Sequence, residues 1–219
     1  MIHRDEIEDM IQGHEPVVVS FHTPDKHYSG HAAAMKASAG AYLSEVYVEE
    51  VPLEFDTWAR AVAFKPVFLD QCFERFSGRP ILWVDADARF VARPDLFLDE
   101  PLFELSYHKH QWSQKHEKEH LSGVMYFGAD WHDRREFVRL WATSIHPNDE
   151  GNQPGLKRAF TQWRSSGNRV IYRDCGPEYV WIFDRFPKLY PSLSPIIEQL
   201  QESRAARKRY RNQRLAGGS

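Results

Sequence analysis

Uninterrupted apolar runs alternate with amphipathic stretches through the first half of the chain. Residues 17–23, 45–51 and 81–88 are rich in β-branched and other apolar side chains, as is typical of strands buried on both faces of a sheet. Residues 31–43, 56–64 and 66–76 have helix-forming composition or helical spacing. Strands and helices that alternate in this order predict a mixed, mainly parallel α/β sheet flanked by helices, with right-handed crossovers.

The second half of the chain is more mixed. It predicts further strands at 102–108, 122–128 and 169–173 and further helices at 134–145, 155–165 and 196–209, and a short helix precedes the first strand at 5–12. No internal repeat or long low-complexity linker interrupts the pattern. We therefore expect a single domain over residues 1–202, followed by a basic C-terminal arm over residues 203–219.

Composition adds a charge asymmetry to this picture. The chain has 219 residues, 42% of them apolar, and a formal charge of −3. The first 202 residues hold all 31 acidic and 22 of the 28 basic side chains, a net charge of −9, whereas the arm carries six basic residues and no acidic ones. This distribution excludes a uniformly basic nucleic-acid-binding domain but leaves a basic arm.

The cellular compartment follows from other features. Two cysteines, Cys72 and Cys175, exclude a disulfide-rich scaffold and a four-cysteine zinc site, and we expect both to be reduced and buried. No apolar run reaches the ~18 residues of a membrane span. The first residues are charged throughout, unlike a signal peptide. We expect a soluble cytoplasmic protein.

The segment with the clearest chemistry is the end of the 81–88 strand. Asp85 and Asp87 follow four apolar residues and are spaced by one, so both side chains can converge where the strand leaves the sheet. Open α/β sheets bind ligands at this end of their strands. Two adjacent carboxylates repel each other unless a cation lies between them, and Mg²⁺ or Mn²⁺ bound there would bridge them to phosphate oxygens. Two solvated loop carboxylates are the alternative.

Several segments, in the right order, resemble nucleotide-sugar glycosyltransferases of the GT-A (Rossmann-like) fold, especially small bacterial and phage members with an Asp-x-Asp motif. The resemblance spans roughly residues 17–208. The segments that carry it are Asp85-Ala86-Asp87 with Arg93-Pro94 and Leu96-Phe97, Lys65-Pro66, Ser122-Gly123, Trp141 with Asn152-Gln153 and Leu156, and Pro195-Ile196-Ile197-Glu198-Gln199 with Ser203-Arg204.

The resemblance implies a metal-dependent enzyme that moves a sugar from a nucleotide-diphosphate sugar, most simply a UDP-sugar, to a hydroxyl acceptor. In this reading Asp87 is the direct metal ligand and Asp85 contacts the ribose or completes the metal shell. The other donor-binding candidates are Thr23, Tyr28, Lys65, Arg89 and Arg204.

Two positions depart from the family pattern. Asn152 replaces an Asp, so Asp149 and Glu150 become the candidates for the base that deprotonates the acceptor if the reaction inverts the anomeric centre. A helix-capping acidic loop is the alternative interpretation of these two residues. Gln199 replaces a metal-binding His, and its neutral oxygen would hold the ion more weakly.

The acceptor is the least constrained part of the reading. The arm at 204–214 suggests a polyanion, and the phage likeness suggests DNA with a hydroxymethylated base, which would have to be flipped out of a duplex. A polysaccharide or lipid-linked sugar is the rival, and the arm would then face an anionic membrane. Four tryptophans form either a sugar-stacking platform or core, namely Trp112, Trp131, Trp163 and Trp181.

Other classes of protein fit less well. A haloacid-dehalogenase phosphatase needs Thr or Val at the position of Arg89, and a nucleotidyltransferase needs a Gly-rich loop that residues 20–30 do not provide. His116 and His120 have zinc-protease spacing without the apolar helix face such a site needs. We expect the run from His108 to His120 to be a polar loop, either over the active site or inert. A non-catalytic nucleic-acid-binding module stays an alternative because of the arm.

Overall fold

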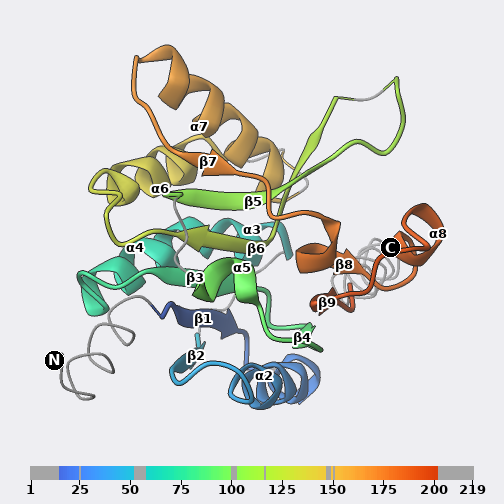
Figure 1. Ribbon diagram of the computed structural model, residues 1–219. Helices are drawn as coiled ribbons and strands as arrows, with labels where there is room; N and C mark the ends of the chain where they lie inside the picture. The colour runs from blue at the N-terminus through green and yellow to red at the C-terminus, as the bar shows by residue number, and fades with distance from the viewer. Residues whose placement is uncertain are drawn as a thin grey trace, which may run out of the picture.

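The computed structural model describes residues 15–24, 26–51, 58–99, 103–115, 117–146, 149 and 151–201. Its main element is a six-stranded sheet in the order β2-β1-β3-β6-β5-β7 (Figure 1). The strands are β1 (Val17–His22), β2 (Val46–Glu50), β3 (Ile81–Val84), β5 (Leu105–His110), β6 (Glu119–Phe127) and β7 (Tyr172–Arg173). β6 alone runs antiparallel to its neighbours, so the mixed, mainly parallel α/β sheet expected from the sequence is confirmed.

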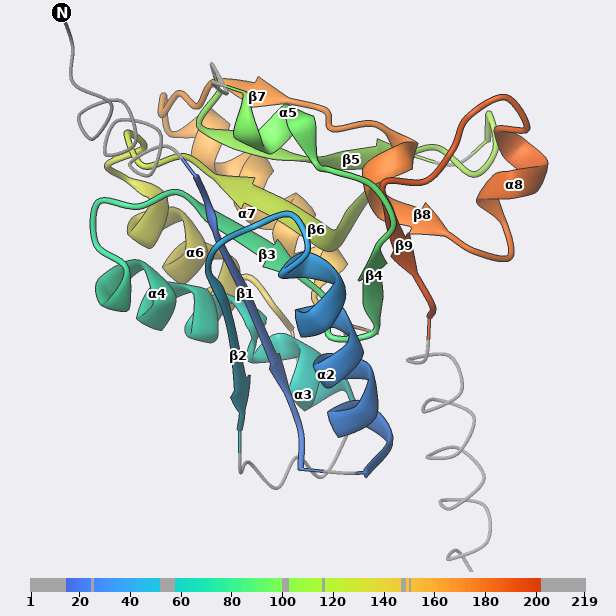
Figure 2. The same cartoon turned by 60° about the horizontal axis from the view of Figure 1, so that its bottom comes forward.

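Helices cover both faces of this sheet (Figure 2). On one face lie α3 (Trp58–Ala63), α4 (Lys65–Arg75), α6 (Arg134–Thr143) and α7 (Gln153–Ser165). The other face is covered by α2 (Lys26–Ala39), α5 (Asp95–Leu98) and the 3-10 turn η1 (Pro177–Val180). Each face has its own apolar core, and both cores include side chains from β1, β3, β5 or β6. Burial on both faces explains why the strands read as continuous apolar runs.

A second, three-stranded sheet lies at one end of the first, in the order β4-β9-β8. It consists of β4 (Ala88–Phe90), β8 (Trp181–Ile182) and β9 (Ile197–Gln199), and the short helix α8 (Phe186–Leu189) links the last two. β3 and β4 are separated only by the turn that holds Asp85 and Asp87. The two acidic residues therefore lie at the junction of the two sheets.

Three expected elements differ from the structure. The strand predicted over 81–88 ends at Val84, because the chain turns at Asp85 and pairs next with β9. The helix predicted over 31–43 begins earlier, at Lys26, and ends at Ala39. The helix predicted over 196–209 is wrong at residues 196–201, of which 197–199 form β9. The rest of that helix, the arm from residue 203 and the helix predicted at 5–12 lie outside the described residues.

The buried side chains settle two other expectations. Trp131, Trp163 and Trp181 are buried, so the core interpretation holds for them, whereas Trp112 stays partly exposed. Cys72 and Cys175 are free and buried, as expected. No helix within the described ranges is long and apolar enough to cross a bilayer.

Candidate functional site

The turn after β3 fixes Asp85 and Asp87 at the carboxyl end of the sheet. The Asp85 N–H donates to the Gly123 carbonyl at 2.9 Å, and the Ala88 N–H donates back to the Asp85 carbonyl at 3.0 Å. The Leu200 N–H donates to the Asp87 carbonyl at 3.2 Å, which ties this turn to the end of β9. Backbone bonds from both sheets thus hold the two acidic residues in place, and Asp87 is largely buried.

One carboxylate oxygen of Asp85 is held from inside the protein. Lys65, buried at the start of α4, donates from Nζ to Asp85 Oδ1 at 2.7 Å and to the Ser122 carbonyl at 2.9 Å. Trp83 Nε1 donates to the same Oδ1 at 3.0 Å. These two donors orient the carboxylate and leave Oδ2 directed elsewhere. A lysine at a helix N-terminus is unfavourable against the helix dipole, and its bond to Asp85 compensates for this.

Asn152 belongs to the same network. Ser122 Oγ donates to Asn152 Oδ1 at 2.9 Å, and Asn152 Nδ2 donates to the Val62 carbonyl at 3.0 Å. Trp141 Nε1 donates to the Asn152 backbone carbonyl at 3.0 Å. Asn152 therefore supports the Ser122–Lys65 pair that holds Asp85, and its amide supplies both a donor and an acceptor, which a carboxylate would not.

Gln199 lies on the Oδ2 side of Asp85. The residue between them is Gly123: a Cβ at this position would lie 3.0 Å from Gln199 Oε1 and 3.4 Å from Asp85 Oδ2. Gln199 is only 2% exposed, and both polar atoms of its carboxamide lack a hydrogen-bond partner within the part of the chain that the structure describes. Buried amide groups are nearly always hydrogen-bonded, so a carboxamide in this environment is suited to bind a polar or cationic ligand.

This donor set suits a hard cation. Two carboxylates and a carboxamide oxygen are the ligand types that Mg²⁺ and Mn²⁺ take in proteins. No cluster of three or more His, Cys, Asp or Glu side chains arranged for a metal occurs among the described residues, so Gln199 would be needed as the third protein ligand. The residues present therefore fit the expected ion.

The candidate base Asp149 is already engaged. Its carboxylate pairs with Arg158 and accepts the His146 N–H at 2.8 Å. Partial burial raises the pKa of Asp149, but these hydrogen bonds outweigh that effect and hold the pKa below its usual value. A lowered pKa weakens a base. The other candidate, Glu150, lies outside the described residues.

The remaining donor-binding candidates fall on both sides of the site. Thr23 follows β1, and Tyr28 lies in the first turns of α2; because β1 is parallel to β3, they share the sheet edge with Asp85. Arg89 donates to the Ala88 and His31 carbonyls and so lies against α2. Arg204 is outside the described residues.

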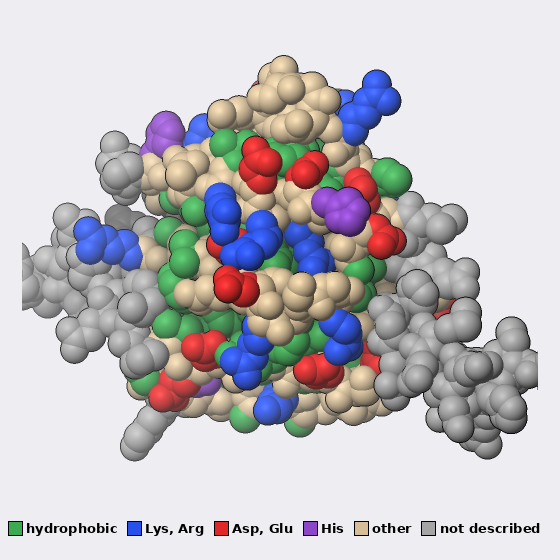
Figure 3. Space-filling model, turned by 90° about the vertical axis from the view of Figure 1, so that its left-hand side faces the viewer, with side chains coloured by type: hydrophobic (Ala, Val, Ile, Leu, Met, Phe, Trp, Pro, Cys, Tyr) green, Lys and Arg blue, Asp and Glu red, His purple; other side chains and the backbone are tan. Residues whose placement is uncertain are grey.

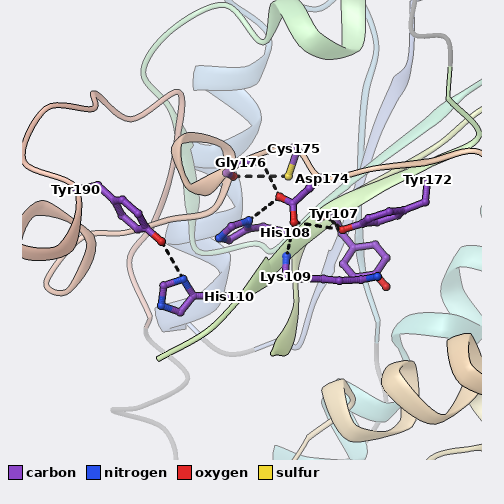
Figure 4. Close-up of polar contacts among 9 residues, drawn as sticks. All are labelled: Tyr107, His108, Lys109, His110, Tyr172, Asp174, Cys175, Gly176 and Tyr190. Atoms are coloured by element: carbon purple, nitrogen blue, oxygen red, sulfur yellow. Dashed lines mark hydrogen bonds and ion pairs between the residues drawn. The ribbon is translucent and has the colours of Figure 1, made fainter. Parts of the chain in front are cut away.

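The polar loop expected over the histidine run is only partly confirmed. Residues 111–115 and 117–118 form a mostly exposed connection between β5 and β6, whereas His108 and His110 are buried in β5. His120 is a residue of β6, so the zinc-protease helix is excluded at His120; His116 lies outside the described residues. His108 Nδ1 lies 2.6 Å from Asp174 Oδ1, and Asp174 also accepts the Lys109 and Gly176 N–H groups at 3.0 Å (Figure 4).

These contacts and the burial of the side chains set the protonation states of Asp174 and His110. Burial raises the pKa of Asp174, but the bonds from His108, Lys109 and Gly176 outweigh it and lower the pKa to about 2. Asp174 is therefore ionised and orients the His108 ring. Burial lowers the pKa of His110 to about 4, so this ring is neutral near pH 7.

Charge is evenly mixed on the side of the molecule opposite the small sheet. Figure 3 shows basic and acidic side chains interspersed there. Arg135 pairs with Asp70 and Glu74, and Arg139 pairs with Asp70. Such paired charges do not form the single-sign patch that a polyanion needs.

Structural comparison identifies the fold. No protein-family model matches the chain, and no curated protein matches its sequence. Among solved structures, it is similar to a glycosyltransferase involved in glycosylation of the major capsid of PBCV-1, with a TM-score of 0.61 and 16% identity over 91% of this chain and 100% of that one. The chain has a glycosyltransferase fold.

Two larger glycosyltransferases share this fold. GlyE of Streptococcus pneumoniae TIGR4 matches 84% of this chain with a TM-score of 0.51 and 17% identity. The bifunctional WbbM matches 85% with a TM-score of 0.58 and 12% identity. This chain covers 55% of GlyE and 46% of WbbM, about half of each.

The sequence singled out Asp85, Asp87 and Gln199, and it named Lys65 and Ser122 through the family resemblance but not their part in holding Asp85. The bond between Lys65 and Ser122 joins residues far apart in the chain, so no local pattern reveals it. Trp83 gave no separate signal because it reads as one more apolar residue of a buried strand. Gly123 did give one: a glycine inside a strand marks a close approach of other groups.

Proposed function

We propose that the protein is a nucleotide-sugar-dependent glycosyltransferase that uses Mn²⁺ or Mg²⁺. The observation that carries the proposal is the buried carboxamide of Gln199, which lies opposite Asp85 Oδ2 and beside Asp87 at the carboxyl end of β3 and has no hydrogen-bond partner among the described residues. An isolated amide in this position is costly unless a ligand completes it. The glycosyltransferase fold supports the assignment but does not by itself establish an activity.

The contacts suggest a separate role for each residue of the site. Asp87, Asp85 Oδ2 and Gln199 Oε1 would hold the ion, which supplies positive charge opposite the developing negative charge of a departing pyrophosphate. Lys65 keeps Asp85 oriented through Oδ1. Its predicted approach to the donor phosphates stays a prediction, as do the base and ribose contacts of Thr23 and Tyr28 and the phosphate contacts of Arg89 and Arg204.

The acceptor hydroxyl must lose its proton as the new bond forms. Asp149 can take this role only if substrate binding releases it from Arg158, because the pair holds its proton affinity low. Glu150 is the other candidate. An Arg158→Gln variant should raise the pKa of Asp149 and shift the acid limb of a pH–rate profile to higher pH if Asp149 is the base. An unchanged limb would exclude Asp149.

A donor screen tests the proposal. Thermal shift and donor hydrolysis are measured across UDP-, GDP- and CDP-sugars with Mn²⁺. We expect one donor class to raise the melting temperature only with the ion present, and Asp87→Asn to abolish the effect. Asp130→Asn, a change at an exposed carboxylate away from the site, is the matched control. Absence of any shift with every donor would overturn the proposal.

Two acceptor classes follow from the sequence. A hydroxymethylated base in phage-type DNA rests on the six basic residues between 204 and 214, and a polysaccharide or lipid-linked sugar is the rival. Salt-dependent DNA binding by the full chain and by a chain ending at Glu202 tests the first class. Equal binding by both would remove the role of the arm. If the Asp87→Asn variant still binds DNA and the parent protein hydrolyses no donor, the protein would instead be a non-catalytic nucleic-acid-binding module.

A further inference from the structure

The segment between β8 and β9 projects from the small sheet and exposes apolar side chains. We call residues 183–194 the α8 segment; Figures 1 and 2 both show α8 at the periphery of the molecule. Phe183, Leu189 and Leu193 are 48%, 50% and 42% exposed. They are three of the seven large apolar side chains that are exposed among the described residues, and Val91, a fourth, bonds through its N–H to the Ile196 carbonyl nearby.

This exposure is not a sign of a loosely packed loop, because the α8 segment has its own anchor. Phe186 is fully buried, with ring centroids 5.0 Å from His110 and 5.3 Å from Tyr190. Tyr190 Oη lies 3.2 Å from His110 Nδ1 (Figure 4). The inner side of the segment is thus fixed to β5, and the outer apolar side chains are held facing solvent.

The exposed apolar residues are accompanied by positive charge. Arg185 and Lys188 are exposed in the α8 segment, against one acidic residue, Asp184. β8, which precedes the segment, pairs with β9, which ends two residues before the last described residue, Gln201. From there the chain continues into six basic residues and no acidic ones between 204 and 214.

We propose that the α8 segment docks the protein on an anionic phospholipid surface. Such a surface accepts apolar side chains at the boundary between headgroups and acyl chains and attracts nearby Lys and Arg. A nucleic acid would bind the Lys and Arg side chains through its phosphates but would offer no apolar surface to Phe183 and Leu189. The combination of the two features therefore favours a membrane over DNA.

The docking surface lies directly beside the candidate site. The Phe183 N–H donates to the Gln199 carbonyl at 3.4 Å, so the first exposed residue of the segment is bonded to the proposed metal ligand. A protein docked through this segment would act on a hydroxyl acceptor carried at the membrane surface, as in a lipid-linked sugar. That consequence rests on the proposed function, whereas the docking itself does not.

Vesicle flotation of the full-length protein tests the docking without donor or metal, so its result is independent of the donor screen. We expect binding to phosphatidylcholine vesicles that contain phosphatidylglycerol and none to phosphatidylcholine alone. Phe183→Ser with Leu189→Ser should weaken binding roughly tenfold or more. The control pair Tyr42→Ser with Ile171→Ser removes similarly exposed apolar side chains elsewhere and should bind like the parent. Absence of binding, or equal loss in both pairs, would overturn the proposal.

A labelled variant gives a positive signal that does not depend on lost binding. Cys72 and Cys175 are buried, so Leu189→Cys adds one accessible thiol for an environment-sensitive fluorophore. Its emission should shift to the blue on phosphatidylglycerol vesicles, whereas a label at Tyr42→Cys should not shift. An unshifted emission from the label at position 189 would refute the docking. The docking would also be refuted if vesicles fail to bind while the protein binds duplex DNA equally well with and without the substitutions Phe183→Ser and Leu189→Ser.

Discussion

Gly123→Ala tests the contact on which the candidate site depends. The added methyl would lie 3.0 Å from Gln199 Oε1, 3.2 Å from Gln199 Cδ and 3.4 Å from Asp85 Oδ2. Gln199 is buried in β9 and can move only by displacing its neighbours. Overpacking of this kind destabilises by about 1–3 kcal/mol, and the lower chain entropy of alanine offsets about 0.4–1 kcal/mol of that. We expect a net loss of about 1–2 kcal/mol, a fall of roughly 3–6 °C in melting temperature.

Gly30→Ala is the matched control. Gly30 lies exposed in α2, and a Cβ there would meet nothing within 4 Å. Alanine inside a helix is more stable than glycine by about 0.5–1 kcal/mol, so this variant should melt slightly above the parent. Thermal and urea unfolding of both variants then give changes of opposite sign. If Gly123→Ala also melts above the parent, Gln199 does not pack against Gly123 and the reasoning about the site fails.

Three further predictions concern other parts of the molecule. Asp87→Asn should reduce metal-dependent donor hydrolysis by roughly two orders of magnitude while the melting temperature measured without metal stays near that of the parent; full activity would exclude Asp87 as a ligand. Lys65→Met removes the donor to Asp85, whose side chain is 36% exposed and therefore partly solvated. We expect the free energy of unfolding, measured with urea, to fall by about 1–3 kcal/mol, and an unchanged value would mean that the pair does not stabilise the fold. His110 is held neutral by a pKa of about 4, so its contribution to stability is complete above pH 6.5 and is lost as the pH falls toward 4. His110→Phe should therefore make the free energy of unfolding depend less steeply on pH between 6.5 and 4, by at most about 1.4 kcal/mol per pH unit. An unchanged pH dependence in unfolding measurements would contradict the assignment.

The parts of the fold that the sequence predicted are those determined by local pattern. The apolar runs that became β1 and β3 are buried on both faces, and their burial is visible in composition alone. The helices α4, α6 and α7 follow their apolar spacing closely. β9 did not follow its local pattern: residues 196–200 suit a helix, but pairing with β4 makes residues 197–199 a strand. A partner so distant in sequence leaves no local signal.

The same distinction applies to the site. Asp85 and Asp87 could be placed because a buried strand leads directly into them. The directions of the two carboxylate oxygens of Asp85 could not be predicted, because they depend on Lys65 from α4 on one side and Gln199 from β9 on the other. The burial of His108 and His110 was missed because imidazoles in a run of Lys, Gln and Glu read as polar, whereas the α8 segment and Asp174 enclose them.

The pairing of β4 with β9 has a consequence for synthesis of the chain. Ala88 lies opposite Gln199, so the two strands are separated by about 110 residues of sequence, and the small sheet can close only after β9 has left the ribosome. The large sheet needs nothing beyond β7 and can form earlier. A nascent or prematurely terminated chain would therefore hold a folded body whose proposed metal site is incomplete, and it would remain unable to consume donor until the last strand joined.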